Sequence, residues 1–241
     1  MSFYSVAELY DSINGSAYEP YADFLEQSFK EASIKVTEVL DLGCGTGGIS
    51  ALLAGKGFDM VALDNSPEML NIARERNYGK NTLLLCQDMR EFELFGTVQA
   101  VYSSFDCLNY IIDPAELVGV FALVKNYLEP GGVFIFDVNT EYRYKEILDG
   151  KSYIYEFEND MAIWRSAYSA ETRLCEFEID LFSKQRSGLY SRMSETQLQR
   201  LHSKEEILAA AKGFTLLRTE AAKGFDGCSE NEKTYYIFRR D

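Results

Sequence analysis

The chain has 241 residues and a formal net charge of −14, from 24 Lys and Arg against 38 Asp and Glu. Hydrophobic residues make up 46% of it and aromatic residues 14%, so a packed core is expected and disorder is excluded for most of the chain. Nucleic acids and anionic membrane surfaces attract proteins through Lys and Arg, and the acidic balance argues against both as partners. The length fits one large domain, or a main domain that carries a smaller one.

Targeting signals and metal-binding patterns are missing from the sequence. No apolar run reaches the roughly 18 residues that a membrane-spanning helix requires, and the first residues lack the basic start of a secretory signal. The five cysteines are scattered without a CxxC pair, which favours reduced thiols in a cytoplasmic protein over a disulfide framework. With His202 as the single histidine, neither a His-ligated metal site nor a Ser-His-Asp triad is expected.

The N-terminal stretch holds Tyr4, Tyr10 and Tyr18 with little periodicity. It forms either a flap over a ligand site or an ordinary packed arm, and the pattern leaves both open. Glu19-Pro20 then predicts the start of a helix, because proline suits the first helical turn, where its missing N–H has no partner to lose. The apolar side of this helix comprises Tyr21, Phe24, Leu25 and Phe29.

Five short apolar runs follow, at residues 36–42, 60–63, 82–86, 98–103 and 132–138. Each run is nearly continuous rather than alternating, which is typical of strands buried on both faces of a parallel sheet. Between them, Ser66-Pro67 and Asp113-Pro114 each place a capping residue before a proline, which predicts two helix starts. This alternation of strands and helices predicts an α/β fold with a doubly wound, Rossmann-like sheet built from right-handed βαβ units.

The pattern changes after the fifth run. In residues 174–181 apolar side chains alternate with acidic ones, which predicts an antiparallel strand with one solvent-exposed face. The acidic residues on that face are Glu176, Glu178 and Asp180. Residues 153–157 and 162–168 look like neighbouring strands, so residues 141–202 are predicted to form a small antiparallel β insertion on the acceptor side of the site described below.

The remaining segments return to the first pattern. Ser203-Lys-Glu-Glu206 is a capping box and predicts a helix. Residues 214–219 and 234–238 predict two final strands, which should be antiparallel because no helical pattern separates them. The predicted main domain therefore comprises residues 1–140 plus 203–241, interrupted by the insertion.

A glycine-rich loop, Leu40-Asp-Leu-Gly-Cys-Gly-Thr-Gly-Gly48, follows the first run and opens a helix. Its glycines permit a tight turn and let a ligand approach the unpaired N–H groups at the helix start. Gly43-x-Gly45-x-x-Gly48, with Asp64 after the next run to bind ribose hydroxyls, also fits the dinucleotide fingerprint of an NAD-dependent oxidoreductase. Against that interpretation, the carboxylate of Asp41 opposes a pyrophosphate and suits a ligand with a free ammonium group.

The loop and the segments after it resemble a known family. Asp41-Leu-Gly-Cys-Gly-Thr-Gly47 resembles the E/DxGxGxG loop of class I S-adenosylmethionine-dependent methyltransferases. The later motifs of that family are similar to Ala62-Leu-Asp-Asn-Ser-Pro-Glu-Met-Leu70, Cys86-Gln-Asp-Met-Arg90, Phe105-Asp-Cys-Leu-Asn-Tyr110 and Leu128-Glu-Pro-Gly-Gly-Val-Phe-Ile-Phe-Asp137. The resemblance covers residues 36–138, with a weaker tail at 203–239. It implies a seven-stranded sheet, S-adenosylmethionine as cosubstrate, and either methyltransferase activity or a non-catalytic protein that keeps the same pocket.

The resemblance also implies a set of cofactor contacts. Asp41 would orient the ammonium group, Asp64 would accept both ribose hydroxyls, and Asp88 would bind the adenine amino group. Met69 and Met89 would pack on the adenine faces. The residues alone leave two other roles open: Asp88 could cap the turn after its strand, and Met69 could pack in the core. The other implied cofactor-binding residues are Tyr10, Tyr18, Gly43, Cys44, Gly45, Thr46, Gly47, Asn65, Ser66, Ser104 and Phe105.

Methyl transfer from a sulfonium is an in-line displacement with an activated leaving group. Positioning therefore supplies most of the rate, and no metal is required. The resemblance places Asp106, Asn109 and Tyr110 on the acceptor side of the fourth motif, and these are the catalytic candidates. The pattern does not indicate which of them accepts a proton. It also leaves open that Asp106 only caps the next helix.

The fourth motif also narrows the acceptor. Family members that methylate amino groups of nucleic-acid bases carry an Asn/Asp-Pro-Pro-Tyr/Phe run there, which this chain lacks. With the acidic charge, this predicts a small-molecule acceptor, with a protein as the alternative, and neither a nucleic-acid nor a membrane partner. Arg165 and His202 are further candidate contacts. The insertion would supply acceptor walls, unless the same residues only fill its core, through Tyr153, Tyr155, Phe157, Trp164 and Tyr168.

Overall fold

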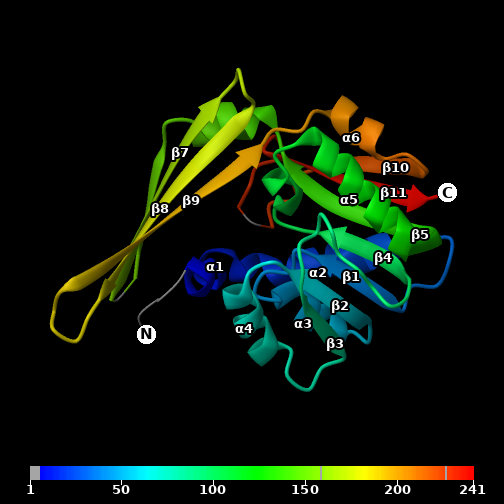
Figure 1. Cartoon of the computed structure of the whole chain (residues 1–241), viewed down its shortest axis with the longest axis horizontal. Helices are drawn as coiled ribbons and strands as arrows, with labels where there is room; N and C mark the ends of the chain where they lie inside the picture. Colours follow the sequence, from blue (N-terminus) through cyan, green and yellow to red (C-terminus); the bar gives the residue numbers. More distant parts are fainter. Residues whose placement is uncertain (1–5, 158, 226) are drawn as a thin grey trace.

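The five apolar runs become the parallel strands of one sheet, as Figure 1 shows. The computed structural model describes residues 6–157, 159–225 and 227–241. Across these ranges sheet A has the order β10-β11-β5-β4-β1-β2-β3, in which β11 runs antiparallel to both of its neighbours. Its strands are β1 (Glu38–Leu42), β2 (Asp59–Asp64), β3 (Thr82–Cys86), β4 (Val98–Ser103), β5 (Leu128–Asn139), β10 (Phe214–Ala221) and β11 (Lys233–Arg240).

Helices cover both faces of sheet A, which explains why its strand sequences are continuously apolar. The helices are α1 (Val6–Asn14), α2 (Tyr18–Phe29), α3 (Gly48–Gly55), α4 (Pro67–Arg76), α5 (Pro114–Tyr127) and α6 (Lys204–Ala210), with the shorter turns η1 (Gly15–Ala17), η2 (Cys107–Tyr110) and η3 (Arg143–Leu148). Along β5, Phe134 and Phe136 pack toward α5 and α6, while Val133 and Ile135 pack toward α2 and α3. None of the helices in the described ranges combines the length and the apolar character that a bilayer crossing would demand.

A second sheet, sheet B, lies between β5 and α6 in the chain. Its strands are β6 (Ser152–Glu156), β7 (Asp160–Ser169), β8 (Leu174–Lys184) and β9 (Tyr190–Arg200). They are antiparallel in the order β6-β7-β8-β9, and Figure 1 shows β8 and β9 as a long hairpin that passes beside α1. Leu9 of α1 packs against Ala162 and Leu181 of this sheet, and α1 also contacts α4, so this helix connects sheet B with the edge of sheet A.

The predicted fold class is confirmed, and many element boundaries agree. β3 and β4 begin and end at the predicted residues, and β10 and β11 are antiparallel. The predicted caps are present: Ser66 Oγ accepts a hydrogen bond from Met69 N at 3.2 Å, and Asp113 Oδ1 accepts one from Ala115 N at 2.8 Å. The capping box before α6 forms both of its bonds. These elements were predictable because their signals are local.

Three features differ from the sequence prediction. Helices α1 and η1 occupy the N-terminal stretch, and Tyr4 lies outside the described residues. The strand β9 escapes prediction because polar residues occupy both of its faces and leave no apolar alternation. Asp180 is 3% exposed instead of solvated, because Arg165 and Arg192 on the neighbouring strands cover it at 3.0 and 2.8 Å. Glu176 and Glu178 are exposed as predicted.

Candidate active site

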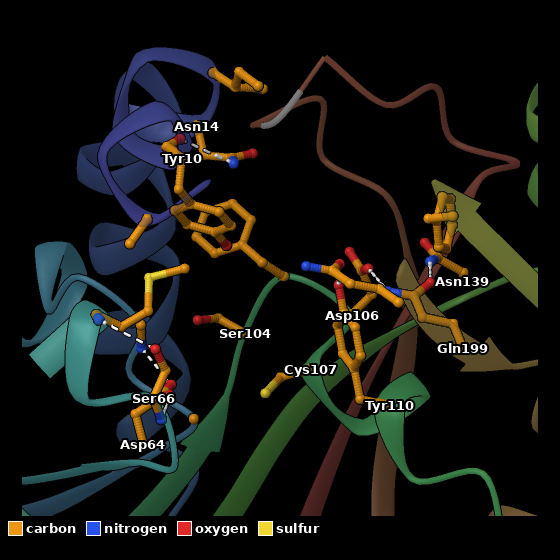
Figure 2. Close-up of a pocket in the computed structure, with 18 of the residues that line it drawn as sticks. Tyr10, Asn14, Asp64, Ser66, Ser104, Asp106, Cys107, Tyr110, Asn139 and Gln199 are labelled. Carbon is orange, nitrogen blue, oxygen red and sulfur yellow. Dashed lines mark hydrogen bonds between the residues drawn. The ribbon is translucent and has the colours of Figure 1, made fainter. Parts of the chain in front are cut away.

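A cavity of about 1150 Å³ opens at the carboxyl ends of the parallel strands, between sheet A, α1 and sheet B (Figure 2). Parallel α/β sheets bind ligands at this edge. The glycine-loop half of the cavity is lined by Gly43, Gly45, Asp64, Asn65, Ser66, Met69, Asp88 and Met89. The sheet-B half is lined by Asp106, Tyr110, Asn139, Arg143, Tyr153, Trp164, Phe177, Met193, Glu195, Gln197, Gln199, Glu232 and Lys233. Ser104 and Phe105, after β4, lie where the chain passes from one half to the other.

The glycine-rich loop between β1 and α3 has a backbone that glycine adopts more easily than other residues. Gly43 and Gly47 have φ angles of +86° and +69°, in the left-handed region. A Cβ atom on Gly43 would also overlap the side chain of Cys107, and one on Gly47 would lie 2.9 Å from the Cβ of Ala73. The loop is therefore packed against both the segment after β4 and helix α4, which fixes one edge of the cavity.

Asp41, the predicted ammonium ligand, lies on β1 directly before this loop and is 1% exposed. Its Oδ2 accepts hydrogen bonds from Tyr102 OH at 2.6 Å and from Ser50 Oγ, whereas no described residue donates to its Oδ1. Burial raises the pKa of this carboxyl to about 7. Asp41 lines an adjoining side chamber of about 20 Å³ with Tyr10 and Cys44. A buried carboxylate oxygen without a donor marks a place for a ligand N–H.

Asp64, the predicted ribose ligand, stands at the end of β2 on the cavity wall. Its Oδ2 accepts from Gly45 N and its Oδ1 from Ser66 N, both at 2.9 Å. Burial raises the pKa of Asp64 above its usual value. Each carboxylate oxygen has two lone pairs, so both oxygens are oriented by backbone donors and still able to accept a ligand hydroxyl.

Asp88, the predicted adenine ligand, lies in the turn after β3. Its Oδ1 accepts from the backbone N and the Nε of Arg90, both at 2.9 Å, and its Oδ2 accepts from the Nη2 of Arg90 at 2.6 Å. Bonding to Arg90 holds the pKa of Asp88 below its usual value. The carboxylate therefore caps its own turn and lines the cavity at the same time.

Most of the predicted cofactor-binding residues meet at the cavity or its side chamber. Those residues are Tyr10, Tyr18, Asp41, Gly43, Cys44, Gly45, Asp64, Asn65, Ser66, Met69, Asp88, Met89, Ser104 and Phe105. Thr46 and Gly47 do not line either space. Gly47 packs on α4, and Thr46 Oγ1 donates to Asp11 Oδ1 at 2.6 Å. Because Asp11 also pairs with Arg76 of α4, Thr46 helps to fasten α1 beside the cavity.

The turn after β4 has a strained backbone. Phe105 and Asp106 have φ angles of +56° and +54°, which are uncommon for residues with side chains and cluster at functional sites. The side chain of Asp106 makes no capping bond to η2. Instead, its Oδ1 accepts from Lys233 Nζ and its Oδ2 from Gln199 Nε2, both at 2.7 Å. Figure 2 shows Asp106 and Tyr110 reaching into the same space, with Gln199 across from them.

Lys233, the first residue of β11, is 2% exposed and holds this turn in place. Its Nζ also lies 3.2 Å from Asp137 Oδ2 and 5.7 Å from the ring centre of Phe105. Asp137 Oδ2 accepts the N–H of Asp106 at 2.8 Å, and its Oδ1 accepts from Tyr21 OH at 2.6 Å. Burial raises the pKa of Asp137, although the charge of Lys233 acts in the opposite direction. One buried cation is thus shared by two carboxylates.

The other predicted catalytic candidates differ in position. Tyr110 lines the cavity, and its OH donates to Gln197 Oε1 at 2.8 Å. Asn109 is fully buried and does not line the cavity. Its Nδ2 donates to Arg200 O at 2.8 Å and its Oδ1 accepts from Asn139 N at 3.0 Å, so it joins the ends of β5 and β9.

The predicted acceptor contacts of Arg165 and His202 are not found at the cavity. Arg165 pairs with Glu178 and Asp180 of β8 instead. His202 is buried, with its Nε2 at 3.1 Å from Leu108 O. The predicted aromatic residues that do line the cavity are Tyr153, Tyr155 and Trp164, while Tyr168 stacks on Tyr144 and Phe157 packs near Leu9.

Sequence reasoning missed Lys233 and the polar wall that β9 contributes. Glu195, Gln197 and Gln199 line the cavity from alternate positions of this strand. The period of two places these three residues on one face only once the segment is known to be a strand, because Ser194 and Thr196 make the other face polar too and hide that signal. Lys233 carries no such signal, because a lysine at the start of a strand is ordinarily exposed.

Comparison with known proteins identifies the family. A profile described as a methyltransferase domain matches residues 39–132. Over 226 residues the chain is 32% identical to the "Putative methyltransferase YqeM" of Bacillus subtilis (strain 168), covering 92% of this chain and 90% of that protein. The chain belongs to the class I S-adenosylmethionine-dependent methyltransferases.

Solved structures share the fold of this methyltransferase. A S-adenosylmethionine-dependent methyltransferase from Clostridium acetobutylicum ATCC 824 gives a TM-score of 0.84 at 27% identity, over 98% of this chain and 97% of that one. SAM-bound CalS10, an amino pentose methyltransferase from Micromonospora echinaspora, gives 0.76 at 24% identity, over 99% and 98% of the two chains. A shorter match, 32% identical over 55% of this chain and 52% of that protein, is the dTDP-3-amino-3,6-dideoxy-alpha-D-glucopyranose N,N-dimethyltransferase of Streptomyces fradiae.

Removing the charge of Lys233 should destabilise the methyltransferase strongly. Lys233→Met would leave Asp106 and Asp137 facing each other without their shared cation, and breaking a buried ion pair from one side costs about 3 to 5 kcal/mol. The free energy of unfolding, measured by urea titration at neutral pH, should fall by that amount. Lys35→Met, which removes an exposed lysine, should change it by less than about 0.5 kcal/mol. Equal changes in the two variants would contradict a structural role for Lys233.

Proposed function

We propose that this methyltransferase transfers the methyl group of S-adenosylmethionine to a small-molecule acceptor. The observation that carries the proposal is one continuous cavity that spans the glycine-loop half and the sheet-B half. Its volume of about 1150 Å³ exceeds the roughly 300 to 1000 Å³ that is usual for one ligand, so it has room for both molecules. Residues 1–140 plus 203–241 would then bind the cosubstrate, and residues 141–202 would select the acceptor.

The residues of the glycine-loop half fit this cosubstrate. The Oδ1 atom of Asp41, which has no donor among the described residues, would accept a hydrogen bond from the ammonium group. The carboxylate of Asp64, already oriented by two backbone N–H groups, would accept the ribose hydroxyls. Met69 and Met89 would pack against the adenine as polarizable apolar surfaces, next to Asp88.

The reaction requires mainly that the protein align the acceptor with the methyl group. S-adenosylmethionine supplies a methyl group on a positively charged sulfur, so we propose a displacement that needs no metal. The chain must place the acceptor in line with that bond and accept a proton if the acceptor carries one. Asp106 and Tyr110 are the candidates that reach the sheet-B half. Tyr10 and Ile13 of α1 line the same cavity and would help to exclude water from it.

A small molecule is the acceptor class that the observations favour. A net charge of −14 opposes binding to the phosphate backbone of a nucleic acid. Relatives carry names that specify small molecules, including the sugar dimethyltransferase above and a "Ubiquinone biosynthesis O-methyltransferase" of Xylella fastidiosa, which is 29% identical over 48% of this chain. None of the cysteines in the described residues forms a disulfide, which suits the reducing cytoplasm as the site of the reaction.

Two other functions weighed from the sequence lack support. An NAD-dependent oxidoreductase would have to place a pyrophosphate next to the buried carboxyl of Asp41. A non-catalytic binding protein would be expected to seal the space beyond Phe105, whereas the cavity continues from Phe105 to Gln199.

Calorimetry with S-adenosylhomocysteine tests the proposed cosubstrate site. Wild type should bind with micromolar affinity, and Asp64→Asn should bind about ten- to a hundredfold more weakly, because charge-assisted hydrogen bonds to the ribose contribute roughly 1.5 to 3 kcal/mol. Glu75→Gln, an exposed substitution on neighbouring α4, serves as the matched control and should bind like wild type. Absence of binding to wild type, or tight binding of NAD in its place, would reject the proposal.

The protonation of Asp41 makes the same binding dependent on pH. Because its pKa is raised to about 7, the carboxylate that pairs with the ammonium group forms only as the pH rises, and the association constant should increase about five- to tenfold from about pH 6 to about 7.5. Asp41→Asn should remove most of this increase. Asp88→Asn should retain it, since Arg90 keeps the pKa of Asp88 low. A full increase in Asp41→Asn would assign the titration to another group.

A further inference from the structure

Both cationic side chains that line the sheet-B half, within the described ranges, are already paired with carboxylates. Lys233 Nζ lies 2.7 Å from Asp106 and 3.2 Å from Asp137. Arg143 Nη1 lies 2.6 Å from Glu232. A phosphate or carboxylate on a ligand is usually held by cations that can turn toward it or by helix N-termini. Recruiting either cation here would leave one or two buried carboxylates unpaired, so this half is poorly suited to an anionic acceptor.

Acidic side chains are available in the same half. Glu195 of β9 is exposed on the cavity wall and accepts a hydrogen bond from Gln197 Nε2 at 2.7 Å, and it forms no ion pair in the part of the chain that the structure describes. Asp106 is held by Lys233 and Gln199 so that its carboxylate lines the space next to Tyr110 (Figure 2). Carboxylates placed in this way attract an ammonium group.

Beside the amides of Asn139, Gln197 and Gln199, this half also has an apolar wall. Tyr153 and Trp164 line it from β6 and β7, and Phe177 and Met193 line it from β8 and β9. Aromatic faces pack against apolar groups and also attract a cation that lies within about 6 Å of the ring centre. This wall therefore suits the apolar body of a molecule whose charge, where it has one, is positive.

We propose that the acceptor is an amine carried on an apolar or aromatic body that bears no phosphate or carboxylate. This inference rests on the proposed function and names its substrate class. It sets the enzyme apart from the Streptomyces fradiae relative, whose name specifies a dTDP-linked sugar and hence an acceptor with a diphosphate. The amine would enter as an ammonium ion drawn by Glu195 and Asp106.

The transfer balances in atoms and charge. The ammonium form of the acceptor gives one proton to the carboxylate of Asp106, which passes it to water, and the nitrogen gains a free lone pair. That lone pair forms a carbon–nitrogen bond to the methyl group as the carbon–sulfur bond breaks, and its electrons remain on the sulfur. The products are a protonated N-methylamine and the neutral thioether S-adenosylhomocysteine.

Three probes with the same body test the acceptor class: 2-phenylethylamine, 2-phenylethanol and 2-phenylethyl phosphate. Each is titrated by calorimetry into the full chain saturated with S-adenosylhomocysteine. The amine should bind about three- to fivefold more tightly than the alcohol, which corresponds to one exposed ion pair, and the phosphate should bind more weakly than either. Glu195→Gln should reduce binding of the amine about threefold or more and leave the alcohol unchanged. Glu176→Gln, an exposed glutamate on the same sheet outside the cavity, should bind all three like wild type.

The outcomes separate the two proposals. Failure of S-adenosylhomocysteine itself to bind rejects the proposed function before any probe is added. If it binds and the phosphate binds more tightly than the amine, or the alcohol binds as well as the amine, the acceptor class is wrong while the cosubstrate site stands. An equal loss of amine binding in Glu195→Gln and Glu176→Gln would likewise reject the role of Glu195.

Discussion

The structure depends on how it accommodates three carboxylates at the carboxyl ends of neighbouring strands, two of them fully buried and one half-buried. Asp41, Asp106 and Asp137 lie at or just beyond the ends of the neighbouring strands β1, β4 and β5. An ionised carboxylate removed from water costs several kcal/mol unless it is paired. Asp106 and Asp137 share the charge of Lys233, so the protein itself offsets that cost. Among the residues that the structure describes, Asp41 has only hydroxyl donors on one oxygen and none on the other, and we infer that its positive partner arrives with the ligand.

The turn after β4 connects the two halves of the cavity. The turn at Phe105 and Asp106 has an unfavourable backbone conformation, which persists because Asp137 accepts the Asp106 N–H and Lys233 holds the side chain. The next residue, Cys107, fills the space above Gly43 that a Cβ would need. A displacement of the segment after β4 would therefore disturb both the glycine-rich loop and the sheet-B half of the cavity. The strained backbone thus lies at the point where one segment contacts both the glycine-rich loop and the other half of the cavity.

How much of this structure the sequence predicts depends on whether the deciding pattern lies within one segment or arises from contacts between distant segments. The parallel strands of sheet A were predictable because burial on both faces leaves continuous apolar runs in the sequence. The caps at Ser66 and Asp113 were predictable because each bond joins residues at most three positions apart. The strand β9 was not predictable, since polar residues occupy both of its faces and only its pairing with β8 defines it as a strand. Motif position also does not fix the direction of a side chain, which is why Asn109 joins strand ends and Thr46 binds Asp11 instead of lining the cavity.

Gln199 shows why the least predictable strand is central to the site. Its Nε2 donates to Asp106, while its Oε1 accepts from Asn139 Nδ2 at 3.2 Å and from Tyr144 OH at 3.0 Å. A buried amide with its donor and acceptor groups both engaged fixes the relative position of the elements that it joins, because breaking any of these bonds leaves a polar group unpaired. Sheet B is thereby held against the turn after β4 at one point of β9. Exposed positions farther along that strand, such as Glu195, can then differ in sequence without moving the carboxylate of Asp106.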